Sequence, residues 1–298
     1  MRITQQMMSN NLIQNMSDGY GKIEDLQNQL SSGKKITLPS QNPTVAMMGI
    51  AYRTDVNHIE QYQNNVSTAQ SWINSSDSAL SQVNSILQNI RDLVSEASTD
   101  TYTSDQRAAI GQQVDQYTKQ LVTLGNTQVG GQYIFSGSNS ANPLLTQDSA
   151  GNVTPNSTAL SNPNFSLDLS DGLRMSVNVD PNTVFTSTMF QNLNGLKDAL
   201  NNPSSTGVDI GTYLGKIDTT LDSVNDAQAN LGARSDRVTM ISNRLDDQKT
   251  TATQIMANNE DVDYPTAIVN LNQQQNVYTA SLSVGARIIQ QSLVNFLQ

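Results

Sequence analysis

The sequence predicts a mainly α-helical protein, a long antiparallel bundle of coiled-coil-like helices with a small β domain inserted into it. Two observations predict the helices, since apolar residues recur at alternating spacings of three and four over residues 45–97 and again over residues 210–255. Repeats held beyond four heptads are typical of long helices that pack in a coiled coil. The third observation is that this period is lost over residues 137–188, where turn-forming dipeptides replace it.

The two long stripes predict two helices of nearly equal length. The first helix follows Asn42-Pro43, which supplies a cap and a first-turn proline. Because each helix can bury its apolar side only on a partner of similar length, we expect the two to pair in antiparallel orientation. The predicted buried positions are Val45, Met48, Tyr52, Asp55, Ile59, Tyr62, Val66, Ala69, Ile73, Ser76, Leu80, Val83, Leu87, Ile90, Val94 and Ala97 in the first stripe, and Ile210, Tyr213, Ile217, Thr220, Val224, Ala227, Leu231, Arg234, Val238, Ile241, Leu245, Gln248, Ala252 and Ile255 in the second.

Two shorter helices complete the predicted bundle. One is opened by a capping box from Thr103 to Gln106, carries apolar residues from Ile110 to Leu124, and is expected to end at Gly130-Gly131. The other carries Met189, Leu193, Leu196 and Leu200 and is expected to end at Asn201-Asn202-Pro203.

The two ends of the chain carry matching apolar stripes of about thirty residues each. They are separated from the long helices by breakers, from Ser31 to Pro43 on one side and from Asp261 to Pro265 on the other. The layout predicts that the first helix pairs with the last. Because these stripes are weak and ordering a residue costs about 1–2 kcal/mol, we expect the pair to be disordered in the monomer and to order against neighbouring subunits. The predicted subunit-interface residues are Ile13, Met16, Tyr20, Ile23, Leu30, Ile268, Leu271, Tyr278, Leu282, Ile289, Leu293 and Phe296.

These features divide the chain into three predicted parts. Residues 1–43 and 261–298 form the terminal helical pair, an assembly core. Residues 44–136 and 189–260 form the bundle rod, and residues 137–188 form the inserted β domain, which we expect at the tip of the rod. Within it, alternation around Phe165 to Leu169 and Leu173 to Val179 predicts two strands, with Asp171-Gly172 as their hairpin turn.

Composition excludes several classes of function. The net charge is −10 and no basic cluster exceeds Lys34-Lys35, so no nucleic-acid partner is expected. There is no cysteine, and no apolar run reaches the length of a membrane span, so we expect no disulfide and no membrane insertion. The first ten residues lack the apolar core of a secretory signal, so we expect either a cytoplasmic location or export without a cleaved signal peptide.

No set of residues converges on a catalytic, cofactor or metal site, so we expect no enzyme activity and no cofactor. His58 is the only histidine and is expected to be a solvated surface residue. The acidic run from Glu260 to Asp263 lacks the glycine and terminal glutamate of a calcium loop, which favours a helix break with Asp263 as N-cap. Trp72 and the methionines at 47, 48, 240 and 256 are expected to serve packing.

Several segments carry a resemblance to a known family. They are the opening Met1-Arg2-Ile3-Thr4, the segments 29–36 and 39–43, Gly131-Gln132-Tyr133-Ile134-Phe135-Ser136-Gly137, Leu231-Gly232-Ala233-Arg234 with Arg237, and Ala280 to Ile288 followed by Ser292-Leu293-Val294. In order and spacing these resemble the bacterial flagellin family, in particular its hook-filament junction proteins. One departure is Pro39-Ser40-Gln41-Asn42-Pro43, where the family usually has Pro-Ser-Asp-Asp-Pro.

The resemblance implies an extracellular structural protein of the bacterial flagellum. Such a protein is exported unfolded by the flagellar secretion system, with a chaperone bound to its C-terminal helix until export. It then forms a ring of subunits between hook-associated protein 1 and the flagellin filament.

Two alternatives share parts of this pattern. A flagellin filament subunit would have the same nested helices and insertion, but the segment Gly131–Gly137 and the last residues look more like the junction proteins. A ligand-sensing helical bundle of the chemoreceptor type would also explain the long heptads, but it should carry a membrane span.

Overall fold

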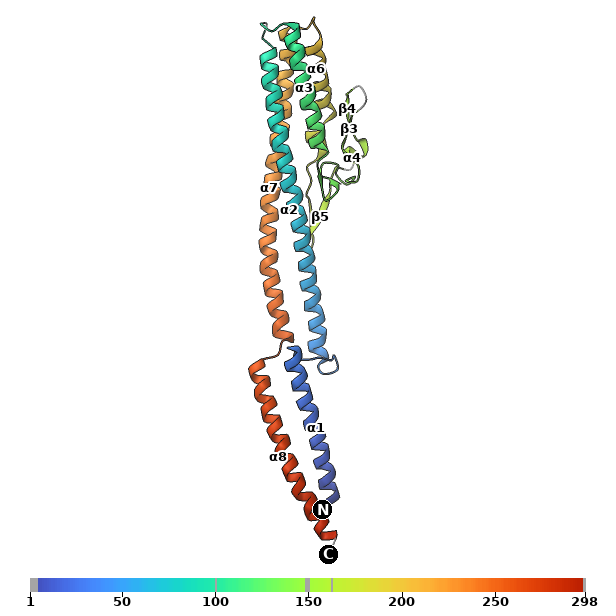
Figure 1. Ribbon diagram of the computed structural model, residues 1–298, viewed down its shortest axis with the longest axis vertical. Coiled ribbons are helices and arrows are strands. Elements are labelled where there is room, and N and C mark those ends of the chain that lie inside the picture. The colour runs from blue at the N-terminus through green and yellow to red at the C-terminus, as the bar shows by residue number, and fades with distance from the viewer. Residues whose placement is uncertain (1–4, 100, 148–150, 162, 297–298) are drawn as a thin grey trace. The chain divides into compact units, whose positions relative to one another are not determined.

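The computed structural model describes residues 5–99, 101–147, 151–161 and 163–296, with side chains described from Met7 to Ala286 within those ranges. Long helices dominate it (Figure 1). The helices are α1 (Gln5–Ser32), α2 (Pro43–Ala97), α3 (Ser104–Gly125), α4 (Ser157–Ser161), α5 (Pro181–Val184), α6 (Ser187–Asn201), α7 (Gly207–Glu260) and α8 (Tyr264–Phe296). The strands are β1 (Gln128–Val129), β2 (Gln132–Tyr133), β3 (Leu145–Gln147), β4 (Val153–Pro155), β5 (Ser166–Ser170) and β6 (Leu173–Ser176). The predicted mainly α fold with a small β insertion is confirmed.

The chain forms two compact units. The first contains residues 1–58 and 248–298, and the second contains residues 59–247. Helices α2 and α7 therefore contribute residues to both units. The predicted terminal pair, 1–43 and 261–298, lies within the first unit, and the predicted insertion, 137–188, lies within the second; the three-part division itself stays a prediction.

In the second unit α2 and α7 pack in antiparallel orientation, as predicted. Asn84 of α2 is hydrogen-bonded to Asn225 of α7, and Arg91 of α2 to Asp218 of α7. Residue numbers therefore increase along α2 in the direction in which they decrease along α7. The buried stripe follows the predicted positions of α2 from Val66 to Ala97 without exception. Helices α3 and α6 pack against each other, and their apolar sides join the same core.

Helix α3 begins as predicted and ends earlier than predicted. Thr103 and Gln106 form the full capping box. The helix ends at Gly125, with Asn126 as its C-cap, and a side chain at Gly125 would overlap Leu145 and would meet Phe185 at 3.2 Å. The predicted stop at Gly130-Gly131 is wrong. Both of these glycines have positive φ angles, 59° and 81°, and they form the tight turn between the antiparallel strands β1 and β2.

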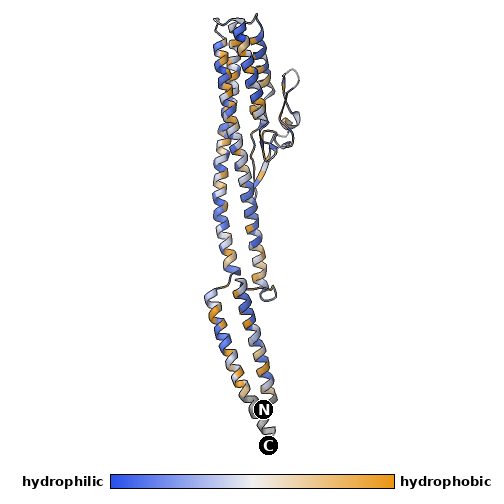
Figure 2. Ribbon diagram, in the orientation of Figure 1, coloured by the Kyte–Doolittle hydropathy of each residue, from blue (hydrophilic) through white to orange (hydrophobic). Residues whose placement is uncertain are grey.

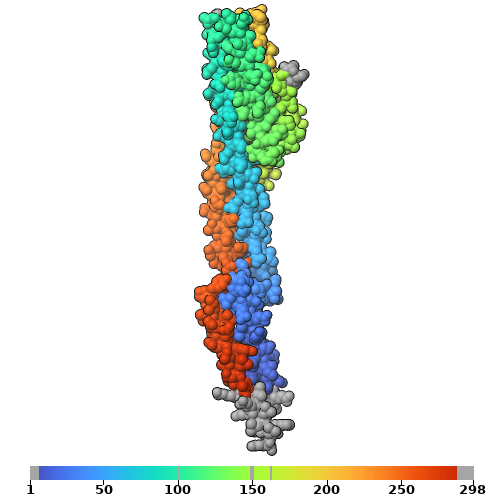
Figure 3. All heavy atoms as spheres, in the orientation of Figure 1, coloured from blue at the N-terminus to red at the C-terminus, as the bar shows by residue number. Residues whose placement is uncertain are grey.

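The insertion contains two further antiparallel hairpins, β3 with β4 and β5 with β6, and the short helices α4 and α5. The predicted turn at Asp171-Gly172 joins β5 to β6, and Gly172 has a φ of 66°. The predicted place at the tip of the bundle is wrong, since the insertion bulges from the side of the helices (Figure 3).

Packing explains the place of the insertion. The Trp72 ring of α2 stacks on Phe165 with ring centroids 4.5 Å apart. Arg234 of α7 donates to the Asn178 carbonyl oxygen at 2.8 Å. The large apolar side chains of this region belong to the same buried cluster as the helices, so the insertion has no separate core. Those side chains are Leu144, Leu145, Leu169, Val177 and Phe185, and Phe135 joins them from just before the insertion.

In the first unit the buried sides of α2 and α7 differ from the predicted stripes. Helix α2 buries Gly49 where Met48 was expected, and Val56 is half-buried while Asp55 is exposed. Glycine was overlooked because it carries no hydrophobic signal. The expected packing role of the methionines is also wrong at Met47 and Met48, and at Met240 in the second unit, since these residues are 73%, 47% and 65% exposed.

Candidate functional site

Helices α1 and α8 pack against each other in antiparallel orientation, as predicted (Figure 1). Gly285 lies opposite Leu12, where a Cβ atom on the glycine would stand 2.8 Å from Leu12 Cδ2. Gly19 lies opposite Tyr278. The pairing therefore depends on glycines that let a larger side chain of the other helix approach.

The contact seam follows a strict spacing of four and three on both helices. Its side chains are buried or half-buried, although many are small or polar. The seam consists of Leu12, Met16, Gly19, Ile23, Leu26 and Leu30 on α1, and of Ala267, Leu271, Gln274, Tyr278, Ser281 and Gly285 on α8.

The apolar stripes predicted from the sequence coincide with this seam only at every second residue. Ile13, Tyr20, Ile268 and Leu282 each follow a seam residue by one position and are 62%, 61%, 48% and 44% exposed. In heptad terms they occupy the e positions. In an antiparallel pair the e positions of both helices lie on the same side of the seam, so these four residues lie along one flank, which also carries the exposed Gln27 and Gln275 and is here called the e flank.

The twelve predicted subunit-interface residues thus divide into three groups. Met16, Ile23, Leu30, Leu271 and Tyr278 lie in the seam within the pair. The four residues of the e flank are exposed. The side chains of Ile289, Leu293 and Phe296 lie outside the described residues. As contacts to other subunits, all twelve stay a prediction.

Apolar exposure is concentrated in the first unit. Among the described residues, the exposed large hydrophobic side chains lie in this unit with two exceptions, Val208 and Met240. Figure 2 shows hydrophobic residues recurring along α8, where Val269, Val277 and Val284 are also at least half exposed. Exposed large apolar side chains at this density favour a role in association, because water solvates them poorly.

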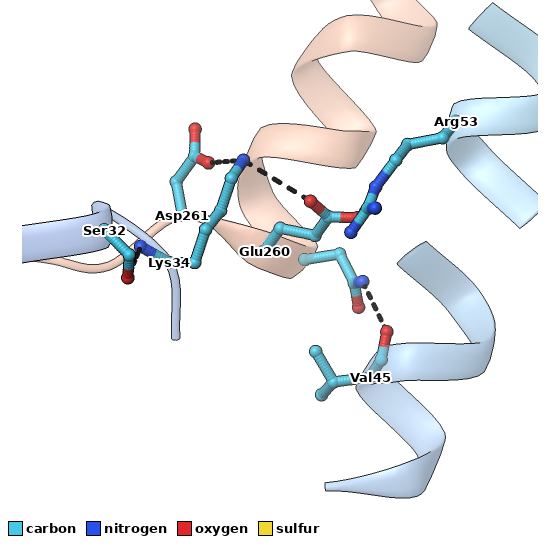
Figure 4. A network of polar contacts seen from close by, with 7 residues as sticks. Ser32, Lys34, Val45, Arg53, Glu260 and Asp261 are labelled. Carbon is cyan, nitrogen blue, oxygen red and sulfur yellow. Dashed lines mark hydrogen bonds and ion pairs between the residues drawn. The ribbon is translucent and has the colours of Figure 1, made fainter. Parts of the chain in front are cut away.

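A charged cluster lies where α7 ends and α8 begins, here called the Glu260 cluster and composed of Lys34, Arg53, Glu260 and Asp261 (Figure 4). The Glu260 side chain is only 5% exposed. Its carboxylate accepts from Arg53 Nε at 2.8 Å and lies 3.3 Å from Lys34 Nζ. Lys34 Nζ also lies 2.7 Å from Asp261 Oδ1. The hydrogen bond to Asp261, supported by Glu260, raises the pKa of the Lys34 ammonium group although burial opposes the shift.

The other residues considered as catalytic or metal-binding candidates have a structural role or are exposed. Asp263 accepts from the backbone and the hydroxyl of Thr266, which confirms it as the N-cap of α8. His58 is exposed, as predicted. Within the described residues, no three His, Cys, Asp or Glu side chains are grouped to hold a metal ion. The same part of the chain has no helix both long and apolar enough to cross a membrane.

Comparison with known proteins agrees with this architecture. Residues 3–140 match the bacterial flagellin N-terminal helical region, and residues 214–297 match the bacterial flagellin C-terminal helical region. The chain belongs to the bacterial flagellin family, whose members are structural components of the flagellum.

Within that family the chain is similar to both filament and hook-associated proteins. It is 30% identical to the flagellin of Clostridium tyrobutyricum over 127 residues, and 29% identical to flagellar hook-associated protein 3 of Escherichia coli over 138 residues. These alignments cover 43% and 46% of this chain, and 34% and 44% of the two relatives, less than half of either. The crystal structure of flagellar hook-associated protein 3 from Legionella pneumophila shares the fold, with a TM-score of 0.61 at 15% identity over 70% of this chain and 98% of that one.

Proposed function

We propose that the protein is a structural subunit of the junction between the flagellar hook and the filament. The observation that carries this proposal is the e flank of the α1–α8 pair, an apolar surface that one chain leaves uncovered. Two matched helices with a glycine-lined seam on one side and an apolar flank on another suit packing against further copies of the same pair. Such copies would form a ring of subunits.

Three observations favour the junction over the filament itself. The segment Gly131–Gly137 and the end from Gln291 resemble junction proteins, and the curated relative of the second alignment is a hook-associated protein. The structural match also covers nearly all of a hook-associated protein 3. A filament subunit is the second candidate, favoured by the 30% identity to a Clostridium flagellin.

The proposed partners follow from the junction. One face of the ring would contact hook-associated protein 1 and the other would contact flagellin. Before export, a chaperone would bind the C-terminal helix α8, whose exposed Ile268, Val269 and Leu282 offer the apolar contacts that such a partner needs. The flagellar secretion system would export the chain without a cleaved signal peptide.

A deletion strain tests the proposal. Cells that lack the protein should keep their hooks, lose attached filaments and release flagellin monomers into the medium, and a plasmid copy should restore swimming. Counting copies separates the two candidates, because a junction protein forms one ring whereas a filament subunit is present in thousands. Attached filaments in the deletion strain would contradict the junction role, and thousands of copies per filament would assign the chain to the filament.

We further propose that the chain acts without catalysis. The residues best suited to catalysis are not grouped in a site, since His58 is exposed and Glu260 is ion-paired with Arg53. The substitution His58→Ala should therefore leave swimming unchanged. Loss of swimming in this variant, with normal protein levels, would contradict the proposal.

A further inference from the structure

The Glu260 cluster lies where the terminal helices leave the ends of the long helices. Each of its four residues comes from a different segment: Lys34 follows α1, Arg53 lies in α2, Glu260 ends α7, and Asp261 precedes α8. Two cations face two carboxylates, so the charges within the cluster balance. The nearly buried Glu260 carboxylate therefore contacts both Lys34, which follows α1, and Arg53, which lies in α2.

The backbone around the cluster forms a short two-stranded bridge. Lys34 and Asp261 are bridge partners. The Lys35 N–H donates to the Glu260 carbonyl oxygen at 2.6 Å, and the Val262 N–H donates to the Gly33 carbonyl oxygen at 2.9 Å. The end of α1 and the start of α8 are thus tied to each other by main-chain bonds as well as by side chains.

Gly49 gives the cluster a fitted slot. This glycine lies in the interior of α2, where glycine normally lowers helix stability. A Cβ atom there would overlap the Glu260 carboxylate and would stand 3.1 Å from its Cδ. The cost of a glycine in a helix is offset here by the space that it leaves for a carboxylate, which indicates a site shaped around Glu260.

None of these bonds uses the seam between α1 and α8. The cluster and the bridge lie beyond the last seam residues, Leu30 of α1 and Ala267 of α8, and they contact α2 and α7 instead. Their stability therefore does not require the two terminal helices to be paired along their length.

We propose that the Glu260 cluster is an anchor that holds the end of α1 and the start of α8 together independently of their pairing. It keeps the two helices adjacent at one end, so that the remaining contacts form within one molecule. Joining two partners at one point raises their effective concentration and lowers the entropy lost when they pair. The anchor thereby preorganises the e flank, a consequence that rests on the proposed function in assembly.

Amide hydrogen exchange on the full chain tests the anchor, because it reports local opening segment by segment. In the unmodified protein, the amides of Lys35 and Val262 should exchange at least tenfold more slowly than those in the middle of α1, around Gln14. Two variants should each remove this difference: Glu260→Gln, which keeps the shape and loses the charge, and Gly49→Ala, which keeps the charge and fills the slot.

Gly232→Ala is the matched control, since Gly232 is an exposed helical glycine with no atom within 4 Å of an added Cβ. It should leave the exchange of Lys35 and Val262 unchanged, and amides of α3 and α6 should stay protected in all variants. The anchor is refuted if Lys35 and Val262 exchange as fast as the middle of α1 in the unmodified chain, or if they stay protected in Glu260→Gln.

Assembly onto purified hooks tests the consequence for the e flank. Glu260→Gln and Gly49→Ala subunits should join hook ends at least tenfold more slowly than the unmodified subunit. Unchanged assembly rates, despite lost amide protection, would overturn the preorganisation. If the unmodified chain itself fails to join hook ends, the proposed function fails, and the exchange data still decide the anchor.

Discussion

The double substitution Ile13→Gln with Leu282→Gln tests whether the e flank is the assembly surface. Glutamine is a good helix former, so both helices should keep their stability. The two apolar side chains are 62% and 44% exposed in the single chain. Since complete burial of such a side chain contributes about 1.5–3 kcal/mol, burying the exposed fractions of both would contribute roughly 1.5–3 kcal/mol to association. This corresponds to a loss of about 10- to 150-fold in affinity between subunits, at about 1.4 kcal/mol per factor of ten.

Incorporation of labelled subunits onto purified hook ends would measure this loss as a shift of the half-saturating concentration. Met240→Gln is the control, because Met240 is 65% exposed but belongs to the other compact unit. Far-ultraviolet circular dichroism should show the same helix content in all three proteins. If the double variant assembles as well as the control, the e flank is not a subunit contact.

Three further substitutions test two buried positions and one ion pair of the second unit. Gly125→Ala should lower the free energy of unfolding by about 1–3 kcal/mol in urea titrations, because the added methyl group would overlap Leu145; unchanged stability would refute this close contact. Ser76→Ala should leave stability equal or raise it by up to about 1 kcal/mol, since the buried hydroxyl has no hydrogen-bond partner among the described residues, and a clear loss in thermal unfolding would contradict that reading. The pKa of the Asp115 carboxyl is lowered, mainly by its hydrogen bond with Lys119. The ionised Asp115 carboxylate should therefore contribute about 0.5–1 kcal/mol to the free energy of unfolding. This contribution should be complete above the pKa of 3.8 in the unfolded chain, and it should be lost as pH falls through the lowered pKa in the folded chain. Unfolding of Asp115→Asn at several pH values measures it, and a stability difference that persists well below the lowered folded pKa would refute it.

Local signals allowed the element starts to be predicted. Asn42-Pro43 opens α2, the capping box at Thr103 opens α3, and Asp171-Gly172 turns the β5–β6 hairpin, because each depends on a few adjacent residues. The pairing of first with last helix also followed from matched lengths alone.

The register of the terminal pair could not be predicted from hydrophobicity. Each terminal helix carries apolar residues at three heptad positions, so two seams one residue apart are almost equally apolar. Packing selects the seam in which Gly19 and Gly285 face Tyr278 and Leu12, and a glycine contributes nothing to a hydrophobic pattern. For the same reason the slot at Gly49 escaped prediction.

The side-on position of the insertion was missed because it depends on contacts distant in sequence. Trp72 and Phe165 stack although 93 positions separate them, by subtraction of their numbers. Arg234 was expected as a seam residue of α7 and instead donates to carbonyl oxygens of the insertion. A period along one helix gives no information about such a partner.

The shared interior of the second unit limits how this chain can diverge. A loop or module with its own interior can be exchanged, lengthened or deleted without harm to its host. Here, removal of the segment between Phe135 and Phe185 would leave Trp72 and the inner sides of α3 and α6 facing water. Chimaeras that carry a foreign outer segment on these helices should therefore fold only when that segment supplies aromatic residues that fill the same space. Substitutions accumulated in this region should be confined to the outward-facing turns.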